Sequence, residues 1–310
     1  MNRCAVMFPG QGSQSVGMGL QFYHHYALSK LAFEEADDAL GYGLSQLIFE
    51  GPAEELEATE VQQPAILVVS VAAWRALKHE RPHFVPTLGM GLSLGEYSAY
   101  VASGALPFSD AVRLTRLRGR AMQTAVAMGV GGMDAVIGLD ASTVEQICHD
   151  ASRTAAVDPA NFNAPGQIVI SGYIQGLEAA EPLIRAAGGR AVRLAVSAPF
   201  HSRLLEPAGE ALKEALAHVR ISRAAFPVIA NVDSELCRDP GDIVSRLVAQ
   251  VSRPVRWEAS VRRALDDGVS HFLELGPGKS LSSLVKKIDR AAQVAAAEDP
   301  EGLRKTLELV

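Results

Sequence analysis

Ser93 lies between two glycines in a pattern that could make it a nucleophile. Residues 91–95 read Gly-Leu-Ser-Leu-Gly, after a short apolar run and before a run that favours helix. A turn from strand to helix lifts such a serine oxygen out of the backbone, and the glycines are needed because a Cβ would clash at so sharp a bend. The next backbone N–H, from Leu94, would face a space where negative charge can develop on a bound acyl oxygen. The pattern is short, so its context must decide between a catalytic turn and a glycine-rich surface turn.

One arginine in the helix expected over residues 110–124 lies on the wrong face for a solvated charge. With Ser109 as N-cap and about 100° per residue, the apolar arc contains these residues: Ala111, Leu114, Leu117, Ala121 and Met122. The opposite face carries Arg113, Arg116 and Arg120. Arg118 falls inside the apolar arc, where an unpaired charge is costly. Its partner is either an internal carboxylate such as Glu96 or the carboxylate of a substrate, which the planar guanidinium matches well.

His201 is the histidine whose setting suits a catalytic base. It stands beside Pro199 in a short loop segment, residues 197–202. A loop histidine taken alone is more often structural, but together with a serine on a strand-to-helix turn it indicates a serine nucleophile activated by a histidine. No aspartate in the chain carries a recognisable triad signature.

Two glycine-rich segments resemble phosphate-binding loops but lack residues that such loops require. After residues 10–17, Met18 stands where the P-loop lysine belongs, and Ser15 replaces the third glycine of a dinucleotide-binding loop. Before residues 276–280, Leu273 occupies the position of the first P-loop glycine. The sequence therefore predicts no nucleotide site of either type.

The composition is that of an ordinary globular protein. Of 310 residues, 48% are hydrophobic and 21% are charged, which suits one large domain or two unequal ones. A formal net charge of −6 favours neither nucleic acid nor an anionic membrane as a partner. No apolar run approaches the ~20 residues that span a bilayer. Because the N-terminus lacks a signal-like pattern and Cys4, Cys148 and Cys237 lack metal-ligand spacing, we expect a cytoplasmic protein without a bound metal.

The order of predicted elements divides the chain into two unequal parts. Strands of the larger part are expected at residues 4–8, 87–90, 226–232 and 271–275, and its helices at 20–40, 53–60, 63–77, 96–103, 110–124, 243–251 and 257–265. Between them, a β-α-β-β-α-β order is expected from residues 133–139, 143–152, 155–162, 167–171, 177–187 and 190–196. We therefore predict an α/β fold, with a large α/β-hydrolase-like domain containing a parallel sheet (residues 1–128 and 198–310) and an inserted small ferredoxin-like domain (residues 129–197).

Six separate segments follow one another in an order typical of a single family: residues 8–14, 91–97, 118–119, 161–167, 197–202 and 276–279. In this order they resemble the malonyl-CoA:acyl carrier protein transacylases and the related acyltransferase domains of polyketide synthases. The resemblance covers nearly the whole chain and is far more specific than the turn at Ser93 alone. One departure is Leu92, because many members of the family have a histidine immediately before the nucleophile.

The resemblance implies a role for each site residue. Ser93 would be the nucleophile, His201 its general base, and the main-chain carbonyl of Gln250 would orient the histidine. The backbone N–H groups of Gln11 and Leu94 would form the oxyanion hole. The acyl group would be bound by Arg118, which would pair with the malonyl carboxylate, and by Asn161, Phe200 and Gln63. In the family, phenylalanine before the histidine accompanies malonyl use and serine there accompanies methylmalonyl use.

The resemblance also implies the reaction and its partners. The malonyl group would pass from malonyl-CoA to Ser93 and then to the phosphopantetheine thiol of an acyl carrier protein, supplying extender units for fatty acid synthesis. We expect a monomer that needs no cofactor. Because carrier proteins are usually acidic, two basic surfaces are candidate docking sites: Arg113, Arg116 and Arg120, and Lys286 and Lys287.

Four alternatives remain open. A free-standing polyketide acyltransferase and a malonate decarboxylase subunit would use the same chemistry. A serine esterase or thioesterase fits Ser93 and His201 equally well but gives no role to an inward arginine. An inactive scaffold subunit would not need Ser93, His201, Gln11 and Arg118 together.

Overall fold

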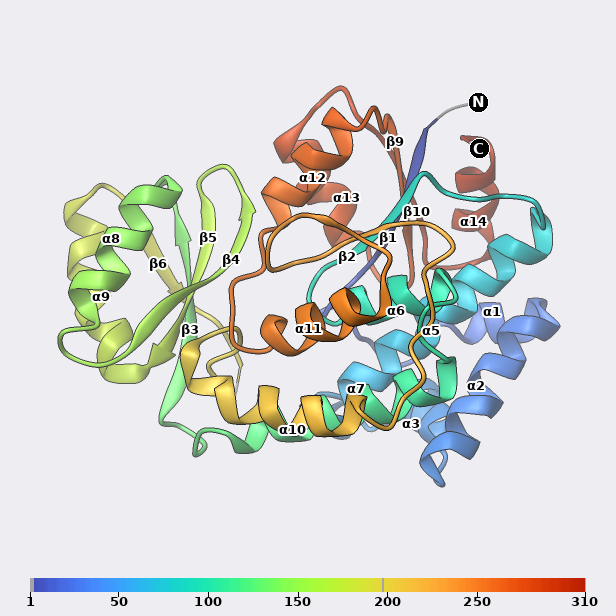
Figure 1. The fold of residues 1–310 in the computed structure, drawn as a ribbon, viewed down its shortest axis with the longest axis horizontal. Coiled ribbons are helices and arrows are strands. Elements are labelled where there is room, and N and C mark those ends of the chain that lie inside the picture. The colour runs from blue at the N-terminus through green and yellow to red at the C-terminus, as the bar shows by residue number, and fades with distance from the viewer. Residues whose placement is uncertain (1–2, 197, 310) are drawn as a thin grey trace.

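The computed structural model describes residues 3–196 and 198–309, in which two sheets are flanked by helices (Figure 1). Ser197, which opens the motif at residues 197–202 and ends the predicted small domain, lies outside the described residues. The first part of the chain forms β1 (Cys4–Phe8), α1 (Leu20–His25), α2 (Ala27–Leu40), α3 (Leu44–Glu50), α4 (Ala53–Leu56), α5 (Thr59–Glu80), β2 (Leu88–Gly91), α6 (Gly95–Ala102) and α7 (Phe108–Thr124). The small sheet and its helices are β3 (Gly131–Ile137), α8 (Ala141–Ala151), β4 (Val157–Ala164), β5 (Gln167–Tyr173), α9 (Ile174–Ala186) and β6 (Arg190–Arg193). After a short 3₁₀ turn (Arg203–Leu205) come α10 (Glu206–Leu216), β7 (Val228–Ile229), β8 (Leu236–Cys237), α11 (Pro240–Gln250), α12 (Trp257–Asp266), β9 (His271–Leu275), α13 (Ser280–Ile288), β10 (Gln293–Ala297) and α14 (Pro300–Leu307).

The large sheet is parallel except at one edge. Its strands lie in the order β10-β9-β1-β2-β7-β8, and only β8 runs antiparallel to its neighbour. All five residues of β1 are buried. Val6 and Phe8 pack on one face with α5 and α7, while Ala5 and Met7 pack on the other with α12 and α13. The predicted parallel sheet is confirmed, and burial on both faces explains why β1 is apolar throughout.

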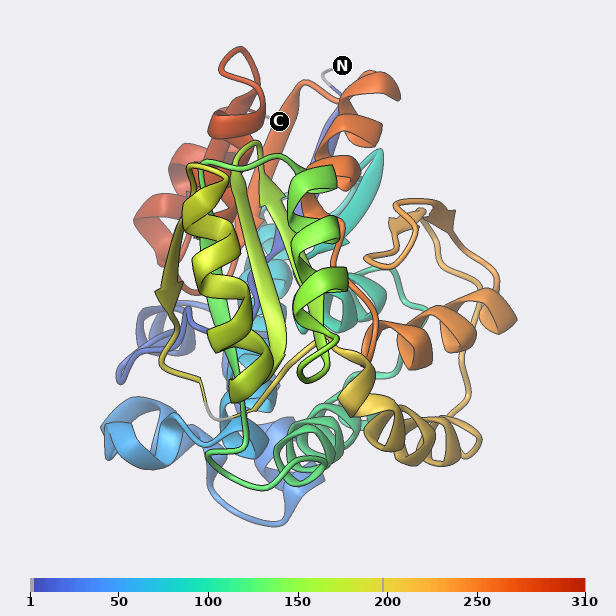
Figure 2. The same cartoon turned by 90° about the vertical axis from the view of Figure 1, so that its left-hand side faces the viewer.

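The small sheet has the predicted order of elements. Its strands lie in the order β4-β5-β3-β6, and every pair is antiparallel. Helices α8 and α9 cover its outer face, which is turned toward the viewer in Figure 2. On the inner face, Met133, Ala160 and Val169 join the core of the large part. The ferredoxin-like order is thus present as one continuous insertion, while the division into domains at residues 129 and 197 stays a prediction.

Several expected elements differ in the structure. The helix expected over 20–40 is two helices, because Tyr26 between them is extended. The helix expected from residue 63 begins at Thr59, so Pro64 lies inside α5 rather than in its first turn. Ser109 is not an N-cap, because α7 begins at Phe108. The strand expected over 226–232 is only the two residues of β7, and that expected over 190–196 ends at Arg193. Helices α3, α10, α13 and α14 and strands β8 and β10 were not predicted.

Candidate active site

Ser93 lies in a sharp turn between β2 and α6. Its φ of 53° falls in the left-handed region, which residues other than glycine rarely adopt. A Cβ on Gly91 would lie 2.1 Å from the carbonyl carbon of Gly95, and a Cβ on Gly95 would lie 2.0 Å from the carbonyl oxygen of Phe8. Both positions therefore require glycine, because the turn passes so close to itself and to β1.

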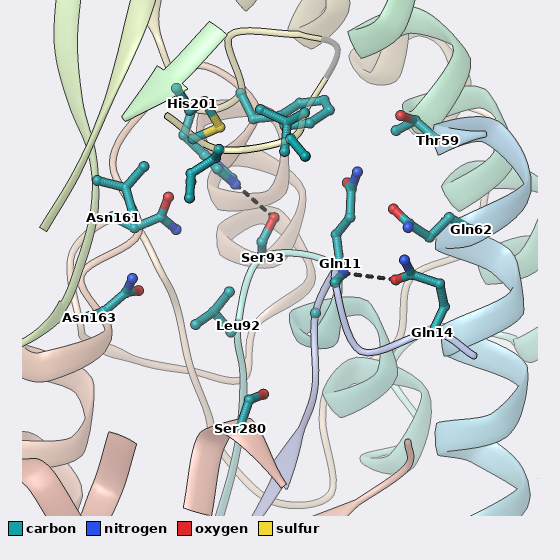
Figure 3. Close-up of a pocket in the computed structure, with 18 of the residues that line it drawn as sticks. Gln11, Gln14, Thr59, Gln62, Leu92, Ser93, Asn161, Asn163, His201 and Ser280 are labelled. Atoms are coloured by element: carbon teal, nitrogen blue, oxygen red, sulfur yellow. Dashed lines mark hydrogen bonds between the residues drawn. The ribbon is translucent and has the colours of Figure 1, made fainter. Parts of the chain in front are cut away.

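The side chain of Ser93 points at His201 (Figure 3). Its Oγ lies 2.7 Å from Nε2 of His201, and Nδ1 of the same ring lies 2.8 Å from the main-chain oxygen of Gln250. Because a carbonyl oxygen can only accept a hydrogen bond, Nδ1 carries the proton and Nε2 is free to accept the proton of the serine. The three groups have the geometry of a nucleophile, a base and an orienting acceptor.

The imidazole of His201 is neutral at physiological pH. The side chain is buried, and this burial, reinforced by the positive charge of Arg118, lowers the pKa of His201 to about 4. The loop that presents it is tight, with His201 at φ 58° and the hydroxyl of Ser202 donating to the carbonyl of Pro199 at 2.8 Å. A neutral ring held in this way can act as a general base.

Arg118 of α7 is buried directly behind the nucleophile. Its Nη1 donates to Oε1 of Gln63 at 2.7 Å, and its Nη2 donates to Oγ of Ser93 at 3.0 Å and to Oε1 of Gln250 at 2.8 Å. All of these acceptors are neutral, and only 1% of the residue is exposed. Within the described part of the chain Arg118 forms no ion pair, so the direct salt bridge to Glu96 that sequence left open is not formed.

The side-chain amide of Gln250 separates Arg118 from Glu96. Its Oε1 accepts from Arg118, and its Nε2 donates to Oε2 of Glu96 at 2.7 Å and to the main-chain oxygen of Ser93 at 2.9 Å. Glu96 is completely buried, and burial raises the pKa of its carboxyl to about 7 even though hydrogen bonds from Gln250 and Asn231 favour the charged form. Gln250 thus orients His201 through its main chain and binds Arg118 through its side chain.

Asn231 contacts the turn from the other side and was missed by the sequence analysis. The N–H of Ser93 donates to its Oδ1 at 2.6 Å. Asn231 lies two residues after the end of β7, the strand that pairs with β2. A polar residue beyond the carboxyl end of a buried parallel strand was the signal that could have found it, because such ends gather at the edge where sites form.

A cleft of about 720 Å³ opens beside Ser93 between the two sheets. Five of the predicted site residues line it: Gln11, Ser93, Asn161, Phe200 and His201. Four others are buried and do not line it: Gln63, Leu94, Arg118 and Gln250. Figure 3 shows Asn161 and Asn163 on one side of Ser93, with Thr59 and Gln62 of α5 on the other. Leu92, the residue immediately before Ser93, also lines the cleft.

Two backbone N–H groups beside Ser93 are available to a ligand. Leu94 is the N-cap of α6, and Gln11 lies in the loop after β1, beside Ser93 in Figure 3. Among the described residues, no acceptor is hydrogen-bonded to the N–H of either residue. The Gln11 loop is braced by the N–H of Gly12, which donates to Oε1 of Gln14 at 2.9 Å. Such a pair of N–H groups could hold an oxygen that becomes negative during attack by Ser93.

Residues 3–196 and 198–309 contain neither a metal-binding cluster nor a membrane-spanning helix. No group of three or more His, Cys, Asp or Glu side chains there could hold a metal ion. In the same residues, no helix combines the length and apolar character needed to cross a membrane. Cys4, Cys148 and Cys237 are buried and form no disulfide.

Comparisons with known proteins agree along the whole chain. Residues 6–299 match the acyl transferase domain family. The malonyl CoA-acyl carrier protein transacylase of Bacillus subtilis is 45% identical over 99% of this chain and 97% of its own length. The structure of an acyl-carrier-protein S-malonyltransferase from Burkholderia pseudomallei is 45% identical with a TM-score of 0.96, covering 99% of this chain and 100% of that one. A malonyl-transacylase in complex with its type II PKS acyl-carrier protein is 41% identical with a TM-score of 0.96, covering 100% of both chains. The chain therefore belongs to the acyltransferase family of the malonyl CoA-acyl carrier protein transacylases.

Proposed function

We propose that this protein transfers the malonyl group of malonyl-CoA to the phosphopantetheine thiol of an acyl carrier protein through an ester on Ser93. The position of Arg118 carries this proposal beyond generic acyl transfer. A buried guanidinium with only neutral partners in the described structure touches the oxygen of the nucleophile itself. Malonyl-CoA would bring a carboxylate that such a group can pair with, whereas a neutral ester would not. The names of the relatives support the same substrate and acceptor.

In the first half-reaction, His201 accepts the proton of Ser93 as Oγ attacks the thioester carbonyl. The tetrahedral intermediate places its negative oxygen against the N–H groups of Gln11 and Leu94. When it collapses, the carbon–sulfur bond breaks and the proton on Nε2 of His201 passes to the departing CoA sulfur. A malonyl ester remains on Ser93. In the second half-reaction the carrier thiol gives its proton to His201, attacks this ester and restores the serine hydroxyl.

The remaining predicted residues would shape the acyl site. Arg118, held by Gln63 and Gln250, would turn its guanidinium from Ser93 Oγ toward the malonyl carboxylate. Asn161 lines the cleft from β4, where its amide could hydrogen-bond the acyl or pantetheine part of the substrate. Phe200 lines the cleft next to the base and would fill the space that a 2-methyl group requires.

The carrier protein would dock where basic residues lie near the cleft. Leu281 and Leu284 of α13 line the cleft, and Lys286 and Lys287 continue the same helix. The face formed by Arg113, Arg116 and Arg120 lies on α7, where Arg116 stacks over the ring of Tyr42 at 5.0 Å. Reversing Arg116 and Lys286 separately to glutamate tests the two surfaces. The KM for the carrier should rise without a change in acylation by malonyl-CoA, and an unchanged KM in both variants would remove both surfaces.

We further propose that the protein acts as a cytoplasmic monomer without a cofactor, supplying extender units for fatty acid synthesis. Ser93, His201 and two N–H groups supply the complete chemistry of thioester exchange, so the reaction as written needs no additional group. The same site would serve a free-standing polyketide acyltransferase or a malonate decarboxylase subunit, and the neighbouring genes would separate these pathways. A hydrolase that uses the same serine would turn over neutral esters with water alone.

Intact mass of the protein after mixing with malonyl-CoA tests the central proposal. We expect a malonyl adduct on the wild type, no adduct on Ser93→Ala, and loss of the adduct when phosphopantetheinylated carrier protein is added. Malonyl-CoA hydrolysis without adduct or transfer would favour a hydrolase instead. Neither adduct nor turnover would leave a scaffold subunit.

A further inference from the structure

The side-chain amide of Asn231 is buried and hydrogen-bonds the main chain of the turn at Ser93, although the transfer reaction does not itself use it. Oδ1 of Asn231 accepts the N–H of Ser93 at 2.6 Å, and Nδ2 of the same side chain donates to the carbonyl of Gly91 at 2.7 Å. One planar amide therefore bridges a donor and an acceptor two residues apart in the turn. Asn231 is 1% exposed, so no water competes for these bonds.

Asn231 is itself anchored through Glu96. Its main-chain N–H donates to Oε2 of Glu96 at 3.0 Å, and the same oxygen accepts from Nε2 of Gln250 at 2.7 Å. That Nε2 also donates to the carbonyl of Ser93 at 2.9 Å. The hydrogen bonds close a ring that begins at the N–H of Ser93 and ends at its C=O. Both polar groups of the strained residue are thus held from outside the turn.

We propose that Asn231 is the positioning residue of the nucleophile, its amide holding Ser93 at positive φ so that Oγ stays in line with His201. Without the bridge, Ser93 would relax toward the commoner negative φ values, and Oγ would swing away from Nε2. By taking the N–H of Ser93, Asn231 also leaves the next N–H, that of Leu94, as the one aimed at the reacting oxygen. The inference rests on Ser93 being the nucleophile of the proposed function.

If Asn231 positions Ser93, its removal should change the reactivity of Ser93 but not the binding of substrate. Among the described hydrogen bonds, the side chain of Asn231 makes none to His201 or to the guanidinium of Arg118. Removing it should therefore slow the attack by Ser93 without weakening the binding of the malonyl carboxylate. A purely structural role would instead lower the melting temperature with no selective effect on Ser93.

The test is the rate at which Ser93 reacts with phenylmethylsulfonyl fluoride, a small neutral serine reagent that needs no carboxylate recognition. Asn231→Ala removes both bonds to the turn. Asn231→Asp keeps the shape and the acceptor for the N–H of Ser93 but puts an oxygen against the carbonyl of Gly91. Ser260→Ala is the matched control, because Ser260 is also buried and its hydroxyl donates to the carbonyl of Arg256 at 2.9 Å, away from the turn. Each variant is assayed well below its melting temperature, with labelling located by peptide mass.

We expect both Asn231 variants to label at least 10-fold more slowly than the wild type, and Ser260→Ala to label at the wild-type rate. In acylation by malonyl-CoA, kcat should fall by a similar factor while KM changes less than twofold. Labelling of both Asn231 variants within twofold of the wild type would overturn the inference and leave the malonyl proposal standing. Normal labelling of the wild type without any malonyl adduct would overturn the malonyl proposal alone. A wild type unlabelled at Ser93 would overturn the premise of the inference.

Discussion

Replacing Arg118 by alanine should change which acyl group the enzyme accepts more than it changes the acylation rate in general. The guanidinium is 1% exposed and the malonyl carboxylate would be its only anionic partner in the described site. Removing one partner of a buried charge pair costs about 3–5 kcal/mol. At about 1.4 kcal/mol for each factor of ten, the lower value corresponds to a loss of about 10²-fold in acylation by malonyl-CoA.

The substitution also leaves three acceptors without their donor: Gln63 Oε1, Gln250 Oε1 and Ser93 Oγ. This structural cost affects every acyl donor, so a fall in the malonyl rate alone would prove nothing. The ratio of acylation rates with malonyl-CoA and acetyl-CoA cancels it, because acetyl-CoA lacks the carboxylate. We therefore expect this ratio to fall by about 10²-fold.

The assay is single-turnover acylation followed by quenched intact mass with each thioester. Arg116→Ala is the matched control, because Arg116 is on the same helix but stacks on Tyr42. Its ratio should equal that of the wild type. If Arg118→Ala slows both thioesters in parallel, with a ratio within threefold of the wild type, Arg118 is a structural residue and the assignment of the carboxylate site is wrong.

Four further predictions concern the pocket, the base and the turn. Phe200→Ser should raise the use of methylmalonyl-CoA relative to malonyl-CoA by ~10–200-fold, the range for one methyl group. Competition between the two thioesters measures this ratio. An unchanged ratio would show that the phenylalanine ring does not limit the size of the acyl pocket. Acylation should stay active below the ordinary histidine pKa and fall with an apparent pKa near 4, because the neutral form of His201 is the base; a pH–rate profile with an inflection at the ordinary value would contradict this. The lowered pKa of His201 also makes the free energy of unfolding depend on pH. It contributes stability that is present above the unfolded-state pKa and is lost as pH falls through the folded-state pKa. The free energy of unfolding of His201→Gln should therefore fall less than that of the wild type as pH is lowered. Gly95→Ala should lower the free energy of unfolding by about 3 kcal/mol, the upper end of the typical cost of overpacking, because its Cβ would meet a carbonyl oxygen at 2.0 Å. Gly241→Ala, with nothing within 4 Å of its Cβ, is the control in urea unfolding, and equal losses in the two variants would refute the steric argument.

Much of the fold followed from local pattern. The buried run of residues 4–8 forms a strand, because a parallel strand covered on both faces is typically a near-continuous apolar run. The β-α-β-β-α-β order was also readable, since turn residues separate its elements. Boundaries were less predictable: the helix around Pro64 extends five residues upstream because tertiary packing overrides the local preference of proline.

The helical wheel of α7 predicts most of the buried face but not every residue on it. It placed Arg118 correctly on the buried side, but it also placed Leu117 there, and Leu117 is 36% exposed. Thr115 is buried instead, with its hydroxyl donating to the carbonyl of Ala111 at 2.9 Å. A periodicity defines a face, but which residues at its margin are covered depends on the neighbouring helices.

The sequence by itself determined the nature of the chemistry: a serine between obligatory glycines, a loop histidine and an inward arginine, each recognisable from its own surroundings. Only the tertiary structure decided what holds them. Asn231 and Glu96 lie 138 and 3 residues from Ser93 along the chain, yet they belong to one hydrogen-bonded ring with the side chain of Gln250. No local pattern encodes such a ring, because hydrogen bonds between buried side chains exist only after distant strands have packed and excluded water. The ion pair that sequence allowed between Glu96 and Arg118 was replaced by an intervening amide for the same reason.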